Sequence, residues 1–378
     1  MALRVALVEP YFGGSHRAWA EGYTRHSAHE VVIFSLPPVF WKWRMQGAHV
    51  LLAEQLRAAV ASDGPFDVVL ATSMTNVPAL LGHARHTIGA IPVVLYMHEN
   101  QLTYPLSPLD REDLTYSMIN WTSMTASDRV VFNSRFHHDA WFAALPEFLG
   151  RFPDERHVHL IDDVVARSEV LPVGIELGPL DEIPRWRRRR PLVLWNQRWE
   201  YDKGPAEFAA AIRSLMDAGV DFDVALAGER YGEEPAEFTA MRAFLGDRLV
   251  YDEYSDRAAY RELLRSADVV VSTAHQEFFG IAITEAVYAG AFPLLPNRLV
   301  YPERIPPEHH AACLYEDAGD LVRKLSQALT DRDWTAPIVD ALKPTMAEFD
   351  WSRLAPIYDA IVADVGPWRQ SVHDRNQR

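Results

Sequence analysis

The chain has 378 residues, of which 48% are hydrophobic and 11% aromatic, so it can bury a large core and its length favours two domains. Its formal net charge of -15 disfavours general attraction to nucleic acid, and any RNA contact would need a local cluster of basic side chains. The single cysteine, Cys313, excludes an internal disulfide and a thiolate metal cluster, which suits a reducing cytoplasm.

Short β-branched runs alternate with segments of helical period along the chain, a pattern typical of parallel sheets covered by helices on both faces. In the first half, strands are predicted at 4–9, 30–36, 67–72, 92–98, 129–134 and 169–175, with helices near 45–61 and 135–148. The N-terminal apolar run is too short for a signal peptide, and no uncharged run is long enough to span a bilayer.

The segment 178–191 breaks this rhythm with three prolines and the arginine run 185–190. Strands are then predicted at 191–197, 223–228, 248–254, 268–273 and 291–296, with helices near 317–330 and 351–364. We therefore predict an N-terminal domain over 1–180, a linker over 181–190, a second domain over 191–350, and a C-terminal helix and tail over 351–378. The arginine run is either a solvated hinge or a basic face for RNA.

Loops at the carboxyl ends of parallel strands are the expected ligand-binding loops. Gly13 and Gly14 follow the first strand, where they would let a ligand approach the backbone, and Ser15 could cap the next helix, unless they form only a tight turn. His98 ends the strand at 92–98 and is a candidate for catalysis, with a purely structural role as the alternative. The same reasoning gives weaker candidates in His16, Asn100, Gln101 and Tyr104.

Two basic residues, Arg198 and Lys203, follow the first strand of the second domain. Cations at this spacing can converge on one diphosphate without a metal, although both could also be solvated loop charges. We expect substitution of either residue to leave the fold intact, because exposed loop charges contribute little stability.

The stretch HQEFFGIAITEA, residues 275–286, joins a strand to a helix that is predicted to start near Gly280. The amides of Phe279, Gly280 and Ile281 would then be unpaired and could bind an anion. Glu277 could accept hydrogen bonds from hydroxyl groups, and Glu285, about one turn into the helix, could bind a ribose diol.

No metal site is predicted. The spacing of Asp221 and Asp223 resembles a cation-binding pair, but these residues open a strand and so lie at the wrong end of it. The adjacent histidine pairs 137–138 and 309–310 cannot both face one metal on a helix or strand.

Taken together, Glu277 and Glu285 around the FFG sequence, Arg198, Lys203-Gly204 and the glycine pair resemble the GT-B glycosyltransferases of family 4, which are retaining and metal-independent. The segments VEPYFGGSHRAWAEGY, SLPPVFWKWRMQGA and YMHENQLTYP resemble the N-terminal domain of the tRNA-queuosine mannosyltransferase group. The resemblance implies an α/β chain of two Rossmann-like, doubly wound domains with an interdomain cleft. It also implies a nucleotide-sugar co-substrate, GDP-mannose in the nearest group, no cofactor, and tRNA as acceptor.

The resemblance further implies roles for individual residues. Arg198 and Lys203 would hold the donor diphosphate, and Glu285 the nucleotide ribose. Glu277 and the amides of 279–281 would hold the sugar hydroxyls, with the base near 249–254. Gly13 or Gly14 would pack against the diphosphate, and His98 would touch the donor sugar. A lipid or small-metabolite acceptor, or a non-catalytic sugar-nucleotide binder or epimerase, stays open as an alternative, and so does the oligomeric state.

Overall fold

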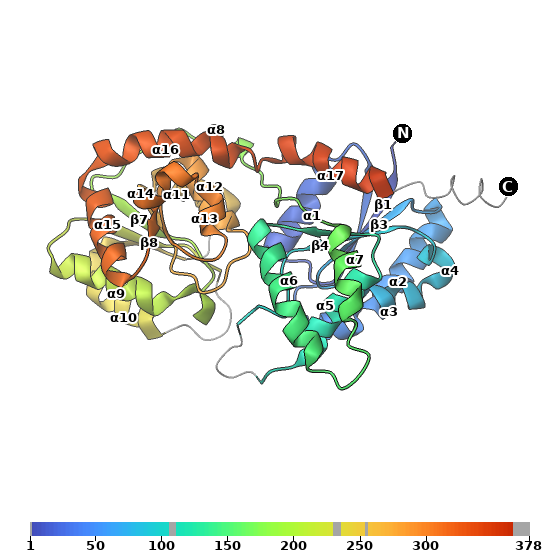
Figure 1. Cartoon of the computed structure of the whole chain (residues 1–378). Helices are drawn as coiled ribbons and strands as arrows, with labels where there is room; N and C mark the ends of the chain where they lie inside the picture. Colours follow the sequence, from blue (N-terminus) through green and yellow to red (C-terminus); the bar gives the residue numbers. More distant parts are fainter. Residues whose placement is uncertain (1, 106–110, 230–235, 254–255, 366–378) are drawn as a thin grey trace. The chain divides into compact units, whose positions relative to one another are not determined.

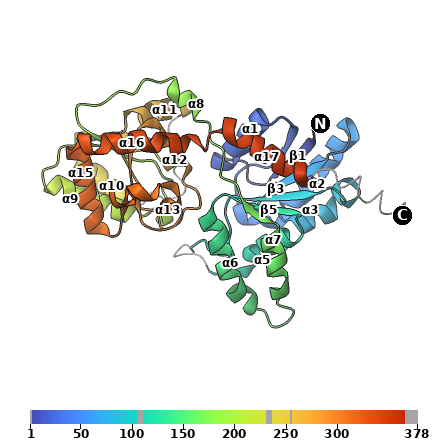
Figure 2. The ribbon, with the colours of Figure 1, turned by 45° about the horizontal axis from the view of Figure 1, so that its top comes forward.

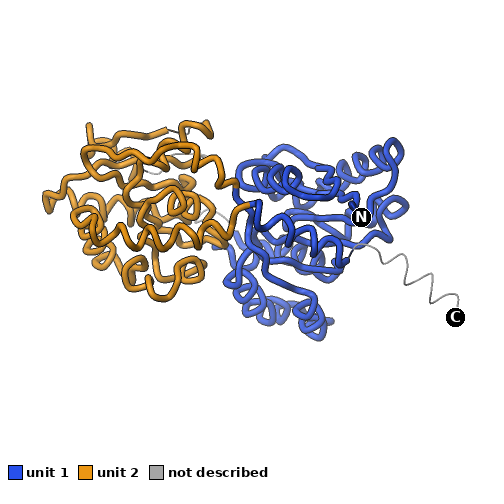
Figure 3. Tube along the Cα trace, turned by 90° about the horizontal axis from the view of Figure 1, so that it is seen from above, with its two compact units in different colours: residues 1–175, 351–378 blue, residues 176–350 orange. Residues whose placement is uncertain are grey.

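The computed structural model describes residues 2–105, 111–229, 236–253 and 256–365. The chain forms two compact units, one made of Met1–Ile175 with Trp351–Arg378 and the other of Glu176–Asp350 (Figure 3). Each unit is built around one six-stranded sheet, and every strand pairing is parallel. Among the described residues, no helix is both long and apolar enough to cross a membrane.

The sheet of unit 1 has the strand order β2-β1-β3-β4-β5-β6. Its strands are β1 Arg4–Glu9, β2 Glu30–Ser35, β3 Val68–Thr72, β4 Val93–Met97, β5 Arg129–Phe132 and β6 Ser168–Val170. Its helices are α1 Gly14–His26, α2 Trp41–Asp63, α3 Val77–His83, α4 Arg85–Ile88, α5 Leu114–Thr125, α6 Arg135–Gly150, η1 Val158–Leu160, α7 Ile161–Ala166 and α17 Trp351–Val365.

The two faces of this sheet pack against different helices because successive strand side chains point to opposite sides. Leu95 and Met97 of β4 belong to the core cluster with Leu52 of α2 and Trp141 of α6. Tyr96 points to the other face, where its ring stacks on Trp19 of α1 and also contacts Tyr358 of α17.

Helix α17 is the last described element of the chain, yet it packs within unit 1, beside α1 (Figures 1 and 2). Asp359 accepts hydrogen bonds from the hydroxyls of Tyr23 and Ser27 and from the backbone N–H of Ala28. Trp19 donates to the Tyr358 hydroxyl over 3.1 Å. The buried aromatic residues around Tyr358 and the hydrogen bonds of Asp359 therefore both hold α17 against α1.

The sheet of unit 2 has the strand order β12-β11-β10-β7-β8-β9. Its strands are β7 Leu192–Trp195, β8 Asp223–Leu226, β9 Leu249–Asp252, β10 Val269–Val271, β11 Phe292–Pro296 and β12 Leu314–Tyr315. Its helices are α8 Gly178–Asp181, η2 Tyr201–Lys203, α9 Pro205–Asp217, α10 Ala236–Leu245, η3 Gly246–Arg248, α11 Arg257–Ser266, α12 Ile281–Ala289, α13 Tyr301–Arg304, η4 Pro307–His309, α14 His310–Cys313, α15 Ala318–Thr330 and α16 Arg332–Ala347. Figure 2 shows α16 running across α12.

The expected α/β architecture of two parallel sheets is confirmed, and each of the eleven expected strands corresponds to one in the structure. Among the elements that were not predicted, two have a clear physical reason. Strand β12 has only two residues, which is too short to leave an alternating pattern. Helix α16 contains Pro337 and Pro344, which sequence rules take as helix breakers.

Candidate active site

The candidate residues of unit 2 come together because β7 and β10 are neighbours in the sheet. The segment after β7 carries Arg198 and Lys203, and the segment after β10 carries Glu277 and leads into α12. Carboxyl ends of adjacent parallel strands meet at one edge of a sheet, so these two segments lie side by side. Gly204, which has φ +63°, lets them approach closely, since a Cβ at this position would lie less than 3.0 Å from the Thr273 carbonyl oxygen.

Lys203 is buried, with 6% of its surface exposed. Its Nζ donates to the Gln276 carbonyl over 2.6 Å and lies 3.2 Å from Asp202 and 3.6 Å from Glu277. The expectation of an exposed loop charge is therefore wrong for Lys203. The packing of η2 against the segment after β10, where Thr273 donates to the Lys203 carbonyl, is what buries it.

Arg198 is exposed, in agreement with the expectation for a loop charge. Its guanidinium lies 3.2 Å from the carboxylate of Glu200. Its side chain is 43% exposed, so an anionic ligand can reach it at small desolvation cost.

Helix α12 begins at Ile281 after Gly280, close to the predicted start. Glu277 accepts hydrogen bonds from the backbone N–H groups of Phe279 and Gly280, over 3.2 and 3.0 Å. The expectation that these two amides are unpaired is therefore wrong for the ligand-free chain, because the preceding carboxylate caps them. The same carboxylate faces Lys203, so one anion already occupies the positive end of the helix.

Glu285 is 4% exposed and lies on α12, where it pairs with Arg257 at the start of α11. The half-buried Tyr260 lies beside this pair, and desolvation of its hydroxyl together with the Glu285 charge raises the pKa of that hydroxyl. Tyr260 accepts a hydrogen bond from Asn196, which also donates to the carbonyl of Ala282 in α12. Arg257 thus covers the carboxylate proposed to bind a ribose.

Several supporting residues of unit 2 gave no sequence signal. Tyr301 shares hydrogen bonds with Ser272 over 2.6 Å and with Gln197 over 3.2 Å, and burial raises the pKa of its hydroxyl. The buried Arg304 donates to the Phe279 carbonyl over 2.9 Å and lies over the Phe279 ring. Both side chains come from the short helix α13, so only the tertiary structure brings them to the start of α12.

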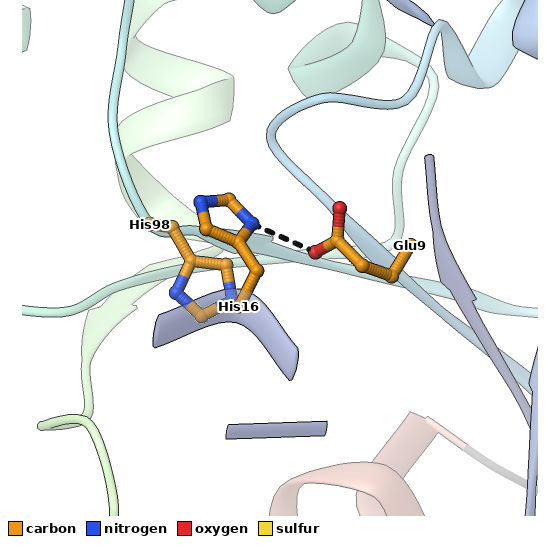
Figure 4. A group of neighbouring side chains, drawn as sticks. All are labelled: Glu9, His16 and His98. Carbon is orange, nitrogen blue, oxygen red and sulfur yellow. Dashed lines mark hydrogen bonds and ion pairs between the residues drawn. The ribbon is translucent and has the colours of Figure 1, made fainter. Parts of the chain in front are cut away.

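In unit 1, the structure brings together three residues that are far apart in sequence: Glu9 at the end of β1, His16 in α1 and His98 after β4 (Figure 4). Glu9 is fully buried, accepts from the Tyr11 N–H over 2.8 Å and lies 2.9 Å from Nδ1 of His16. The rings of His16 and His98 lie 4.4 Å apart, centroid to centroid. His16 and His98 were predicted, whereas Glu9 was missed because it reads as part of the strand.

His98 is neutral in this environment. Burial first, and then the neighbouring His16 and His137, hold the pKa of His98 well below its ordinary 6.5. Its Nε2 is buried and has no hydrogen-bond partner among the described residues. A neutral imidazole with an unused polar atom can accept or donate one hydrogen bond to a ligand hydroxyl.

By composition, Glu9, His16 and His98 could also hold a metal ion, since their ligand atoms lie within 4.8 Å of one another. The direct Glu9–His16 contact is an orienting hydrogen bond without any metal. This arrangement was not anticipated, because its members share no sequence spacing.

The loop after β4 holds the remaining candidates of unit 1. Asn100 is buried, and its carboxamide oxygen accepts from the N–H groups of Leu102 and Thr103. Gln101 donates from its side chain to Glu99 over 3.0 Å. Asn100 therefore shapes the loop, while Gln101 and Tyr104 are partly exposed within it.

The glycine pair lies where α1 starts, with Gly13 as the capping position and Gly14, at φ +50°, as the first helical residue. The expectation that Ser15 caps the helix is wrong, because Ser15 lies inside the first turn and no side chain caps it. Only residues 10–13 separate this helix start from the end of β1.

Two remaining sequence interpretations concern the start of β8 and the segment that contains β9. Asp221 and Asp223 pair with arginines, namely Arg190, Arg248 and Arg188. Of the segment 249–254, expected near the base, residues 249–252 form β9 and Tyr254 lies outside the described residues.

Comparison with known proteins places these units in a family. Residues 4–175 match the family described as tRNA-queuosine alpha-mannosyltransferase N-terminal, and residues 180–341 match glycosyl transferases group 1. A solved structure of a sucrose-phosphate synthase from Thermosynechococcus elongatus shares the fold across 96% of this chain and 99% of that chain, with a TM-score of 0.71 and 16% identity. A glycosyltransferase from Rickettsia africae shares it across 96% of this chain and 98% of that chain, with a TM-score of 0.67 and 14% identity.

A tRNA-queuosine alpha-mannosyltransferase from Drosophila melanogaster is 34% identical in an alignment of 334 positions that covers 85% of this chain and 85% of that protein. Identity at this level over most of both chains establishes that this chain belongs to the tRNA-queuosine alpha-mannosyltransferase family.

Proposed function

We propose that this chain transfers mannose, with retention of configuration, from GDP-mannose to queuosine in tRNA. Family membership supports the sugar and the acceptor. The observation that carries the donor assignment is Lys203, a buried cation that meets Glu277 at the start of α12. A cation and a helix N-terminus together suit a diphosphate.

In the proposed reaction, the bond between the mannose anomeric carbon and the GDP oxygen breaks, and its electron pair stays on the diphosphate. The queuosine hydroxyl oxygen bonds to the anomeric carbon on the same face, and its proton passes to the departing phosphate oxygen. Lys203 and Arg198 stabilise the negative charge that grows on this phosphate, and such charge stabilisation lowers the barrier. No carboxylate acts as nucleophile.

Two carboxylates bind the donor in this proposal. Glu277 turns from the amides of Phe279 and Gly280 towards the sugar hydroxyls, so that these two amides are released and bind the donor together with that of Ile281. Glu285 accepts from the ribose hydroxyls while Arg257 holds its second side in place.

Unit 1 contributes the acceptor side and part of the donor contact. We assign to neutral His98 a hydrogen bond with the donor sugar, through the buried Nε2. Gly13 or Gly14 packs against the diphosphate at the start of α1, where the Gly13 amide already donates to the Tyr11 carbonyl. His16, Gln101 and Tyr104 are assigned to the acceptor, and Asn100 supports the loop that carries two of them.

The test incubates the protein with GDP-mannose and with UDP-glucose, each with tRNA that contains or lacks queuosine, and analyses the digested nucleosides by mass spectrometry. We expect a hexose on queuosine only with GDP-mannose. Transfer to lipid or a small metabolite, or conversion of the sugar nucleotide without transfer to RNA, would replace this proposal by one of the alternatives. Chelation of metal ions in the same assay addresses metal independence.

A further inference from the structure

We propose that a basic surface at the amino ends of the unit 2 strands binds the phosphate backbone of an RNA acceptor. The surface consists of Trp186 and Arg187–Arg190, which line an open hollow of about 420 Å³ together with Asp223. This proposal rests on the proposed function, because the RNA is the tRNA that accepts the sugar.

The arginine run divides into residues that hold the fold and residues that do not. Arg185 is partly buried and donates to the carbonyls of Gly290 and Ala267. Arg188 and Arg190 lie 3.4 and 3.6 Å from the buried Asp223. These three side chains fix the segment against the start of β8 and the end of α12.

Arg187 and Arg189 point to a different role. Both are exposed, and neither has an ion-pair or hydrogen-bond partner among the residues that the structure describes. They stand on a backbone that the contacts of their neighbours hold in place, so binding a ligand costs mainly the rotamer freedom of the two side chains. Arginine in such a setting suits phosphate oxygens, which its planar group can contact through two N–H donors.

The local charge is opposite to that of the whole chain. Contacts and electrostatic interactions around this end of the sheet involve the arginines 185, 187, 188, 190, 248, 265 and 332 and the aspartates 181, 221, 223 and 268. Arginines therefore outnumber their acidic partners here, although the net charge of the chain is -15. An excess of positive charge gathered on one surface attracts a polyanion locally.

Trp186 adds an aromatic face to this surface. Its side chain is 46% exposed, and the Arg188 guanidinium lies 5.7 Å from its ring centroid. An exposed ring beside arginines provides a stacking surface for an unpaired base, a combination that single-stranded nucleic acids favour.

The basic surface lies far enough from the donor-binding residues that only a large ligand can contact both. Arg187–Arg190 precede β7, whereas Arg198 and Lys203 follow it, so the two groups lie at opposite ends of this strand. A four-residue strand spans about 13 Å. A small acceptor at the carboxyl end cannot reach the arginines, while a folded RNA can contact both ends of unit 2.

The experiment compares the double variant Arg187→Ala/Arg189→Ala with the unaltered chain. Binding of queuosine-containing tRNA is measured at several salt concentrations, and KM and kcat are measured for both substrates. We expect the slope of log Kd against log salt to fall by about two, one per lost phosphate contact. KM for tRNA should rise several-fold, while KM for GDP-mannose and kcat at saturating tRNA stay unchanged.

Two control variants sharpen the result. Arg57→Ala/Arg323→Ala removes two exposed arginines elsewhere and should bind tRNA normally. Arg187→Lys/Arg189→Lys keeps the charge and should recover most of the salt slope. If the unaltered chain and the alanine variant have the same Kd and the same salt slope, the inference is wrong, but the proposed function still stands. A lack of any transfer to tRNA by the unaltered chain would instead overturn the proposed function, and the inference with it.

Discussion

Lys203 and Arg198 differ in burial, and this difference separates the expected effects of replacing them. Lys203→Ala leaves the buried Asp202 without its nearest cation, so we expect a loss of about 3–5 kcal/mol in the free energy of unfolding as well as lost turnover. Arg198→Ala removes an exposed side chain, so stability should change by less than about 0.5 kcal/mol. Its turnover should fall by about 10²–10³-fold if it stabilises the leaving diphosphate.

Denaturant unfolding together with steady-state kinetics measures both effects. Lys343→Ala is the control, because Lys343 is an exposed lysine that also pairs with an aspartate, Asp181. Near-normal turnover in both the Lys203 and Arg198 variants would rule out their assignment to the diphosphate.

The buried His137 makes stability depend on pH in a direction that the structure fixes. Burial lowers the pKa of His137 to about 3, whereas an unfolded chain protonates histidine near 6.5. Between these values the unfolded state binds more protons, so the free energy of unfolding falls as the pH drops from 6.5 towards 3. The lowered pKa of His98 acts in the same direction.

We therefore expect His137→Gln to weaken this acid dependence in chemical denaturation between pH 7 and pH 4. His138→Gln, on the more exposed neighbour, is the matched control. The same slope in the chain with and without His137 would show that this group does not cause the acid sensitivity.

The cluster of Glu9, His16 and His98 leads to a third prediction. If the Glu9–His16 contact orients the imidazole without a metal, chelation by EDTA leaves turnover unchanged and added zinc gives no gain. Metal analysis of the purified protein should find less than one ion per chain. Loss of activity on chelation, restored by one divalent cation, would instead identify this cluster as a required metal site.

At the residue scale, the sequence predicted which loops meet better than it predicted the contacts within them. Lys203 and Glu277 could be placed together because each follows a strand, and the parallel-sheet rule joins such loops. The capping of α12 by Glu277 and the support from Arg304 depend on side-chain directions that no spacing rule gives.

At the level of elements, α17 is docked on unit 1 through close contacts of Trp351 with two glycines. A Cβ at Gly22 or at Gly174 would lie less than 3.0 Å from the Trp351 ring. We expect Gly22→Ala to displace α17, and hydrogen exchange should then lose protection both in α17 and in the facing part of α1. Gly82→Ala is the control, since nothing lies within 4 Å of a Cβ there and alanine favours a helix. Normal protection of α17 in the Gly22 variant would show that the helix is held mainly by Asp359 and its partners.

Strands were easier to predict than helices in this fold because each buried strand is a short apolar run between polar loops. β1 matches its predicted bounds, whereas β5 and β10 are shorter than predicted because polar residues such as Asn133 and Ser272 follow them as loop anchors. The sequence indicated a C-terminal helix, but not that α17 packs against α1 of the first unit, since contacts between distant segments leave no local pattern.

On the scale of the whole molecule, each unit has its own sheet and core, so heat can unfold the two in separate steps. Arg198, Lys203 and the start of α12 all belong to unit 2. A ligand stabilises the folded state that binds it, by about 2.7 kcal/mol at one hundred times its Kd. We therefore expect GDP to raise the melting temperature of unit 2 in calorimetry, with a smaller rise for UDP and little for either in Arg198→Ala. If GDP and GDP-mannose shift no transition, unit 2 does not bind the donor and the proposed diphosphate contacts are wrong.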